Sequence, residues 1–258
     1  RRTDAVAQVE NLGIAGVVSS DFATVVGGAE VVILCVPIGA MESIAREIVP
    51  FVGAGTVITD VGSVKGNVVE KLGPIFKGRA HFIGSHPMAG SEQAGIEAAR
   101  ANLFEGAVCM LTPESDSAPE KVAVIEKFWT LLGARVRVLS ATEHDEIVAL
   151  VSHLPHLLAA ALVNLVCAQN ADSINFSGNG FRDTTRIAAG PPPMWAEILR
   201  SNRVPLRRAV EGMIEQLSAV LANIDEGDSA PLENFLEKAR AQRIAITTGD
   251  TNGVLENS

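Results

Sequence analysis

Residues 31–40 read VVILCVPIGA, an apolar and β-branched run that ends at Pro37-Ile38-Gly39. Similar short runs recur along the first half of the chain, at 56–60, 81–84, 108–111 and 135–139. Amphipathic segments separate them, as at 40–49 and 118–132. Continuous apolar strands with helices between them are typical of a parallel sheet covered on both faces. The sequence therefore predicts a doubly wound α/β domain in this half.

The rhythm changes a little beyond the midpoint of the chain. Apolar residues then follow one another by three and four through 147–166 and 204–224, the spacing of amphipathic helices. Another helix is expected over Pro231–Ile244, with proline in its first turn. We therefore predict two domains, 1–140 and 141–258, the second all helical. Helices this apolar favour a homodimer built through the helical domain, with a monomeric bundle as the alternative.

Composition excludes several classes of protein. Of the 258 residues, 47% are apolar and 20% charged, which fits a globular protein and not a disordered one. The formal charge of −9 argues against a nucleic-acid partner, because phosphate binding needs clustered Lys and Arg. The three cysteines lie far apart in apolar runs and indicate core thiols of a reducing compartment, so a cytoplasmic protein is expected. No uninterrupted apolar stretch is long enough to cross a bilayer, and no membrane partner is expected.

Small, polar and titratable residues follow the second and third predicted strands. The segment 60–66 (DVGSVKG) follows one, and 84–92 (GSHPMAGSE) begins at the end of the other. Ligands collect at the carboxyl ends of parallel strands, so these loops are expected to form one site. Ser63 could equally be the N-cap of a plain strand-to-helix turn, and His86 a loop histidine. The glycines near His86 would admit a ligand closely, and imidazole suits proton transfer near neutrality.

Several segments, taken in order, resemble prephenate and arogenate dehydrogenases of tyrosine biosynthesis. They are VILCVPIGA at 32–40, TDVGSVKG at 59–66, FIGSHPMAGSEQAG at 82–95, EHDEIVALVSHLPH at 143–156 and GFRDTTRIA at 180–188, with Met194-Trp195 following. The resemblance covers nearly the whole chain. It implies a Rossmann-like dinucleotide-binding domain followed by a helical dimerisation domain.

The activity that the resemblance implies is an NAD(P)-dependent oxidative decarboxylation of prephenate to 4-hydroxyphenylpyruvate. Hydride leaves C4 of the cyclohexadienol, carbon dioxide departs and the ring becomes aromatic. An arogenate dehydrogenase that gives tyrosine directly is one alternative, and a non-catalytic dinucleotide-binding protein is another. His156, with no obvious extra acid beside it, favours prephenate.

The resemblance also implies roles for individual residues. His86 would act as general base on the C4 hydroxyl, and Ser63 would fix that hydroxyl beside the nicotinamide. Arg186 would clamp a substrate carboxylate, or it could pair with Asp183 on a helix surface. Further substrate contacts are expected from His156, from His144 as a gating contact, from Ser91 and Glu92 at the mouth, and from Trp195, which could close the pocket or pack in the core. Cofactor contacts are expected from Val36, Pro37, Ile38, Asp60, Gly62 and Ser63.

Two features of the family pattern bear on the ligands. No GxGxxG occurs in the chain, which starts at Arg1 just past the expected second strand, so the first βαβ part is expected to be missing from it. The residue that selects NAD or NADP would lie there; we expect NAD, with NADP as the alternative. No HExxH motif or cysteine pair accompanies the histidines of 144–156, and no metal is expected.

Overall fold

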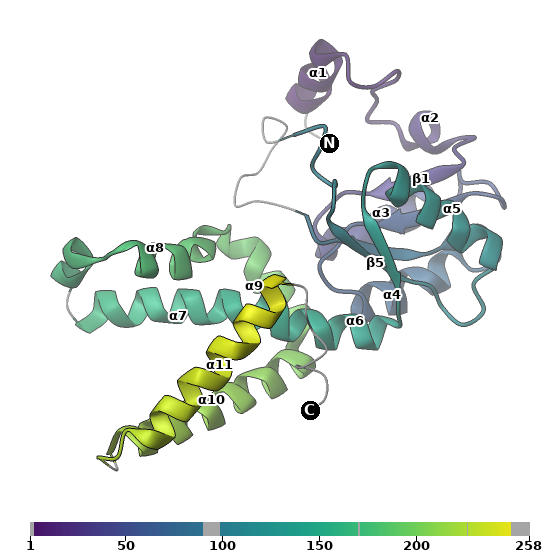
Figure 1. Ribbon diagram of the computed structural model, residues 1–258. Coiled ribbons are helices and arrows are strands. Elements are labelled where there is room, and N and C mark those ends of the chain that lie inside the picture. Colours follow the sequence, from purple (N-terminus) through teal and green to yellow (C-terminus); the bar gives the residue numbers. More distant parts are fainter. Residues whose placement is uncertain (1–2, 90–98, 170, 226, 249–258) are drawn as a thin grey trace. The chain divides into compact units, whose positions relative to one another are not determined.

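The computed structural model describes residues 3–89, 99–169, 171–225 and 227–248. The chain divides into two compact units between Leu206 and Arg207. The first unit holds the strands and the helices around them, and the second holds most of one long helix and the helix after it (Figure 1). The described residues for which the sequence predicts a function all lie in the first unit.

Strands and helices alternate through the first half of the chain. In order they are α1 (Thr3–Leu12), α2 (Phe22–Val26), β1 (Val31–Leu34), α3 (Ile38–Ile48), β2 (Val57–Asp60), α4 (Gly66–Phe76), β3 (His81–Phe82), β4 (Gly84–Pro87), β5 (Val108–Thr112), α5 (Pro119–Leu131) and β6 (Arg135–Val138). The apolar runs thus form strands, as predicted.

The strands form two adjoining sheets. The first is parallel, in the order β1–β2–β3, and the second has the order β4–β5–β6. Strand β5 runs antiparallel to β4 and parallel to β6. Only Ile83 separates β3 from β4, and its N–H donates to the carbonyl of Ile58 in β2 at 2.9 Å. The predicted parallel sheet is present in β1–β3. The antiparallel direction of β5 could not be predicted from the apolar pattern of the sequence.

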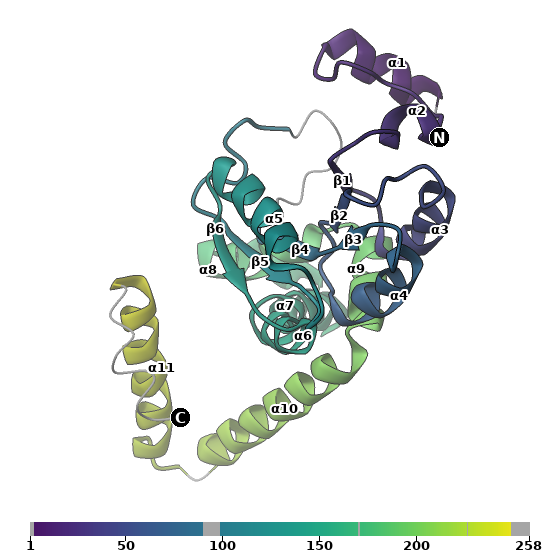
Figure 2. The ribbon, with the colours of Figure 1, turned by 90° about the vertical axis from the view of Figure 1, so that its right-hand side faces the viewer.

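The two faces of β2 enter two different cores, because successive strand residues point to opposite sides. Ile58 packs with Met41 of α3 and Phe76 of α4. Its neighbour Val57 packs with Trp129 of α5. Figure 2 shows α3 and α4 on one side of the strands and α5 on the other. The expectation that both faces of the sheet are covered is confirmed for this strand. The loop that follows β2 begins at its carboxyl end, outside both cores.

The second half of the chain is helical, as predicted. Its elements are α6 (Ala141–Val148), η2 (Ala149–His153), α7 (Leu154–Gln169), η3 (Ala171–Phe176), α8 (Asn179–Thr185), η4 (Arg186–Ala189), α9 (Pro192–Ser201), α10 (Arg203–Asp225) and α11 (Ala230–Thr248). A capping box of Ser140 and Glu143 begins α6. A π-helical turn, η2, joins α6 to α7, and the N–H of Leu154 bonds the carbonyl of Ala149. Pro155 has no N–H for the regular ladder, which accounts for the irregular turn.

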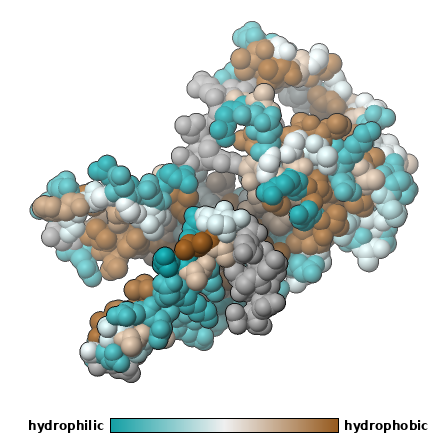
Figure 3. All heavy atoms as spheres, viewed as in Figure 1, coloured by the Kyte–Doolittle hydropathy of each residue, from teal (hydrophilic) through white to brown (hydrophobic). Residues whose placement is uncertain are grey.

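Several large apolar side chains of the helical part face solvent. On η2, α7 and η3 they include Leu150, Val151, Leu165 and Phe176, the last 88% exposed. Figure 3 shows apolar surface over the helices α7 and α8. On α10 and α11, within the second unit, Leu217, Leu221, Ile224, Leu236 and Ile246 are exposed as well. Exposed apolar surface of this extent marks a surface that another chain covers.

The continuous helical run Ala141–Gln169 is apolar and long enough to cross a membrane by length and composition. The sequence expectation that no stretch reaches that length is therefore wrong, because α6, η2 and α7 continue one another. The same run carries the fully buried His144 and His153 and packs against the sheet domain through Asp145. We interpret it as a core and interface helix of a folded domain.

Candidate active site

Two adjoining cavities lie at the carboxyl ends of β1, β2 and β4. The first, of about 540 Å³, is lined by Ser63, His86, Met88, Arg186 and Trp195 among others. The second, of about 600 Å³, is lined by Val36, Pro37, Ile38, Gly62 and Glu197 among others. Ser63 and Cys35 line both cavities and therefore mark the boundary between them. The structure thus brings the predicted catalytic and cofactor residues together at one edge of the sheet.

A buried ion pair shapes the loop after β2. The ammonium of Lys65 bonds the carboxylate of Asp60, and neither side chain is exposed at all. The same ammonium donates to the carbonyl of Ser85 at 2.8 Å, which ties the loop to β4. Asp60 also accepts from the N–H of Gly62 at 2.8 Å. Asp60 does not line either cavity, so its effect on a ligand would be exerted through the shape of the loop that presents Gly62 and Ser63.

Asp145 caps the helix that follows this loop. Helix α4 begins at Gly66 with Lys65 at the N-cap, and no side chain of the loop caps it. The N–H groups of Lys65 and Gly66 instead donate to the two oxygens of Asp145, at 2.8 and 2.9 Å. The alternative that Ser63 is a plain N-cap is therefore wrong. The hydroxyl-bearing residue lies at the cavity boundary instead.

His86 lies on β4 and is buried, yet it lines the first cavity. Its Nδ1 is 2.8 Å from Nε2 of His144. Burial holds the pKa of His86 well below its ordinary value, and the neighbouring His144, Lys65 and His153 act in the same direction. The imidazole is therefore neutral at neutral pH and can accept a proton, as a general base must.

His144 lies behind His86 and is fully buried. Its Nδ1 is 2.8 Å from Oδ1 of Asp145. Burial lowers the pKa of His144, partly opposed by the hydrogen bond to Asp145. The resemblance gives His144 a gating contact with the substrate. In the structure it is absent from the described lining of the first cavity and reaches that cavity only through His86.

Trp195 and His156 form one stacked pair. Their ring centroids are 3.5 Å apart and the ring planes differ by 10°. Trp195 lines the first cavity, whereas His156 is buried and absent from the described lining, and burial lowers the pKa of its imidazole. A Cβ at Gly190 would lie 2.4 Å from Nε1 of Trp195 and 3.3 Å from His156. Glycine at 190 is thus what allows the pair to close one side of the cavity.

Arg186 begins the short helix η4 and lines the same cavity as His86 and Ser63. This is the place in which a carboxylate clamp would have to lie. Ser91 and Glu92, which the resemblance places at the mouth, lie outside the described residues.

Sequence reasoning missed several residues of the site. Lys65 was part of the quoted motif but was given no role, and Asp145 is the immediate neighbour of His144. Glu197 of α9 accepts from the N–H of Gly39, at the start of α3, across 158 positions of sequence. The adjacency of His144 and Asp145 was the one signal that sequence offered. The contacts of Lys65 and Glu197 join segments that are distant in the sequence, and no local sequence pattern predicts them.

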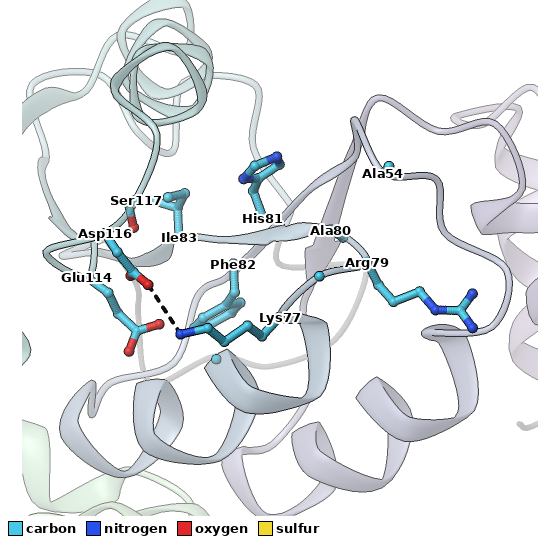
Figure 4. Close-up of a pocket in the computed structure, with 12 residues that line it drawn as sticks. Ala54, Lys77, Arg79, Ala80, His81, Phe82, Ile83, Glu114, Asp116 and Ser117 are labelled. Carbon is cyan, nitrogen blue, oxygen red and sulfur yellow. Dashed lines mark hydrogen bonds and ion pairs between the residues drawn. The ribbon is translucent and has the colours of Figure 1, made fainter.

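A further cavity, of about 320 Å³, lies at the opposite edge of the sheet (Figure 4). Lys77, His81, Glu114 and Asp116 are among its lining residues. Lys77 pairs with Asp116 at 3.3 Å, and both side chains are mostly exposed. Figure 4 shows Arg79 pointing away from these acids. The Lys77–Asp116 pair is solvated, so this cavity does not have the buried ion pair and buried imidazole of the other edge.

The fold and the site define a class of protein. A parallel sheet with ligand cavities at its carboxyl edge is the arrangement of dinucleotide-binding α/β domains. A buried neutral imidazole beside that edge adds the proton acceptor that alcohol oxidation requires. The combination is that of a dinucleotide-dependent dehydrogenase.

Comparison with family models specifies the class further. Residues 2–138 match the model of the prephenate dehydrogenase nucleotide-binding domain, and residues 140–238 match that of the prephenate dehydrogenase dimerization domain. The chain belongs to the prephenate dehydrogenase family. The resemblance seen in the sequence motifs, and the predicted order of an α/β part followed by a helical dimerisation part, are confirmed.

Individual relatives agree with the family models. The chain is 32% identical to a cyclohexadienyl dehydrogenase of Zymomonas mobilis, over 90% of this chain and 80% of the relative. It is 35% identical to a prephenate dehydrogenase of Lactococcus lactis, over 93% and 68%. A crystal structure of prephenate dehydrogenase from A. aeolicus, in complex with hydroxyphenyl propionate and NAD+, superposes with a TM-score of 0.89 at 30% identity, covering 95% of this chain and 86% of that one.

Proposed function

We propose that this protein catalyses the NAD-dependent oxidative decarboxylation of prephenate to 4-hydroxyphenylpyruvate, a step of tyrosine biosynthesis. One observation supports this function above all others. His86, a buried imidazole that is neutral at neutral pH, lines a cavity together with Ser63 and Arg186 at the carboxyl edge of the sheet. A base, a hydroxyl and a guanidinium are the three groups that an anionic cyclic alcohol requires.

The second cavity has the character of a nicotinamide site. Its lining is mostly apolar, with Val36, Pro37 and Ile38 at the end of β1 and Gly62 at the end of β2. A Cβ at Gly62 would lie 2.9 Å from Asp60 and 3.2 Å from Met41, so the loop stays narrow there. These residues would hold NAD, whose nicotinamide supplies the hydride acceptor when bound. The family's nucleotide-binding domain and the NAD+ in the A. aeolicus complex support NAD as the cofactor.

Proton transfer is the task of His86. The imidazole accepts the proton of the C4 hydroxyl, which places electron density on that oxygen and weakens the C4–H bond. Ser63, at the boundary of the two cavities, would hold the hydroxyl so that the C4–H bond faces the cavity in which the nicotinamide would lie. Loss of the ring carboxylate as carbon dioxide then makes the ring aromatic, which supplies the driving force.

Substrate recognition is the task of the residues from the helical part. Prephenate carries two carboxylates, and Arg186 can hold one of them with two parallel hydrogen bonds. Trp195 packs over the ring, with His156 behind it on the side of the second carboxylate. Ser91, Glu92 and His144 are proposed to complete the mouth and the inner end of the site, as the family resemblance implies.

Assembly and location follow from the same domains. We propose that 1–140 binds the dinucleotide and 141–258 supplies the substrate contacts and the homodimer surface, in agreement with the dimerization domain that the helical part matches. Only Cys109 is buried, so the expectation of core thiols is wrong for Cys35 and Cys167, which are exposed. All three thiols are free, which supports a place in the reducing cytoplasm.

Formation of NADH by the full-length protein tests the function directly. We expect turnover with prephenate, and turnover with arogenate at a lower kcat/KM. A preference for arogenate would support the alternative function, arogenate dehydrogenase. A crystal structure of an arogenate dehydrogenase from Synechocystis is also similar to this chain, with a TM-score of 0.82 at 26% identity, covering 95% of this chain and 89% of that one. Binding of NAD without turnover of either compound would contradict the proposal.

A further inference from the structure

Three side chains form a continuous line of hydrogen bonds that begins at the first cavity. His86 lines the cavity, and its Nδ1 meets Nε2 of His144 at 2.8 Å. His144 in turn meets Oδ1 of Asp145 through its Nδ1, also at 2.8 Å. The two inner members are buried. The two ends of the line therefore differ: His86 is accessible to a ligand in the cavity, and Asp145 is a buried carboxylate.

The carboxylate end is fixed in place by the backbone. Both oxygens of Asp145 accept N–H groups of the α4 N-terminus, at 2.8 Å from Lys65 and 2.9 Å from Gly66. Both oxygens thus act as acceptors, and the N-terminus of a helix favours a negatively charged acceptor at this position. Its position relative to β4 is fixed as well, since Lys65 bonds the carbonyl of Ser85, next to His86.

A carboxylate that is held as an acceptor of two backbone N–H groups also accepts from His144, and this fixes every proton along the line. Nδ1 of His144 must carry the proton that it donates to Asp145. In the neutral ring Nε2 of His144 is then an acceptor, so Nδ1 of His86 must be the donor. The proton of neutral His86 is thereby held on Nδ1, and its Nε2 is left with the lone pair that can meet a substrate hydroxyl.

We propose that Asp145 is the positioning residue of the catalytic base, acting through His144 to hold His86 in the tautomer whose Nε2 can accept the substrate proton. The inference rests on the proposed function of His86 and extends it to two residues behind the site. His144 is then an intermediary between Asp145 and the base, and its buried position has a chemical purpose.

The same line stabilises the product of proton transfer. When His86 takes a proton at Nε2 it becomes a cation, and His144 and Asp145 supply the acceptor and the negative charge behind it. Within the described part of the chain, three other charged or titratable groups face this region: His153, the cavity residue Arg186, and Lys65. Lys65 is paired with Asp60. Among these groups, Asp145 is the acid that contacts the line of histidines.

Nuclear magnetic resonance of the ring nitrogens tests the tautomer without any activity measurement. The chain has only five histidines, so a ¹⁵N-labelled sample gives few ring signals, and a His86→Asn variant assigns those of His86. We expect Nδ1 of His86 to be protonated and Nε2 to be unprotonated in the neutral protein. A proton on Nε2 instead would overturn the proposal, whatever the turnover rate.

The variant Asp145→Asn tests the consequence for the reaction. An asparagine side chain has one oxygen and one NH2 group, so its NH2 must face a donor, either Nδ1–H of His144 or the α4 N–H groups. The protons on His144 and His86 therefore cannot keep the arrangement described above. We expect kcat to fall about 10²- to 10⁴-fold, with KM nearly unchanged. The apparent pKa of the acid limb in kcat/KM should also fall, because the negative charge behind the imidazolium is lost. Full kcat with an unshifted acid limb would contradict the proposal.

Two comparisons separate positioning from a general loosening of the fold. Ser140→Ala removes the cap of α6, the helix that carries His144 and Asp145, and should lower the urea midpoint of unfolding with kcat unchanged. In a His144→Leu background, Asp145→Asn should add little to the loss of kcat, because the route to His86 is already cut. Additive losses would contradict an action through His144. If neither prephenate nor arogenate is turned over by the unmodified protein, the proposed function fails, while the tautomer experiment still decides the placement of the protons.

Discussion

The two edges of the sheet each carry a cavity, and similar residue types lie in or directly behind them, but the physical character of the two edges is opposite. At the carboxyl edge, Lys65 and Asp60 form an ion pair with no exposure to solvent, and His86 is buried beside it. At the amino edge, Lys77 and Asp116 are paired while 78% and 68% exposed (Figure 4). Both edges hold a histidine, a lysine and an acid, so residue type alone does not distinguish them.

Burial is the physical difference between the two edges. Removal from water penalises the charged form of an imidazole and strengthens every hydrogen bond around it. At the amino edge, water screens the charges and competes for each hydrogen bond. The proposed catalytic base therefore depends on the layers that cover the carboxyl edge, and similar residues in the open cavity of the amino edge remain a solvated surface.

The largest expected effect comes from His86→Asn. Removal of the proton acceptor should lower kcat about 10²- to 10⁴-fold while KM stays nearly constant, since asparagine keeps a polar side chain at the cavity. Steady-state rates of NADH formation measure both quantities. The matched variant is His81→Asn at the amino edge, for which we expect no loss of kcat. A raised KM at unchanged kcat in His86→Asn would count against its role as base.

The next effect is on stability, in Lys65→Met. Methionine is close to lysine in shape, but Asp60 would remain buried without its partner, at a cost of about 3–5 kcal/mol in the free energy of unfolding. Urea unfolding followed by circular dichroism measures the change. A loss below about 1 kcal/mol would mean that the pair contributes little to the folded state.

The buried histidines predict a third effect, which depends on pH. Burial lowers the pKa of His153 from 6.5 to about 4. Because the folded-state pKa is the lower one, the neutral ring is favoured in the fold, and its contribution is complete above pH 6.5. It is lost progressively as the pH falls toward 4, by about 3 kcal/mol in all. His153→Gln should therefore flatten the dependence of unfolding free energy on pH in this interval, and an unchanged slope would refute the assignment.

The sequence predicted most of the architecture of the sheet domain and the members of the site, for identifiable reasons. Apolar runs such as 31–34 and 57–60 became strands because strands buried on two faces have no polar alternation. Polar residues after those strands met at one edge because parallel strands end together. The antiparallel placement of β5 could not be predicted, because direction depends on loop geometry and not on residue type.

The interactions behind the site were also beyond the sequence. The contacts of Asp145 with α4 and of Glu197 with α3 join positions far apart in the chain. No periodic pattern carries that information, because it arises only when the helical part packs on the sheet. The family resemblance named His144 but gave it a gating contact with the substrate, because a motif does not reveal how deeply each residue is buried.

Arg186→Ala tests substrate binding at the carboxyl edge. Loss of a charge-assisted contact to a carboxylate costs about 2 kcal/mol, which corresponds to a rise in KM for prephenate of about 30-fold. The control is Arg182→Ala, four residues earlier and absent from the described lining of the cavity. Steady-state kinetics at constant NAD measure both variants. Equal effects of the two substitutions would show that general charge, rather than a clamp, attracts the substrate.

The smallest expected effect belongs to the amino edge. Lys77→Met removes a pair that is mostly exposed, and because water screens such a pair, the free energy of unfolding should change by less than about 0.5 kcal/mol. Urea unfolding in parallel with Lys65→Met gives the contrast between the two edges in a single measurement. High salt should leave the stability of both variants relative to the unmodified protein nearly unchanged, in one case because the lost pair is buried and in the other because it was already screened. A large effect of Lys77→Met would show that exposure does not distinguish the two cavities, and burial would then no longer explain why only one of them is reactive.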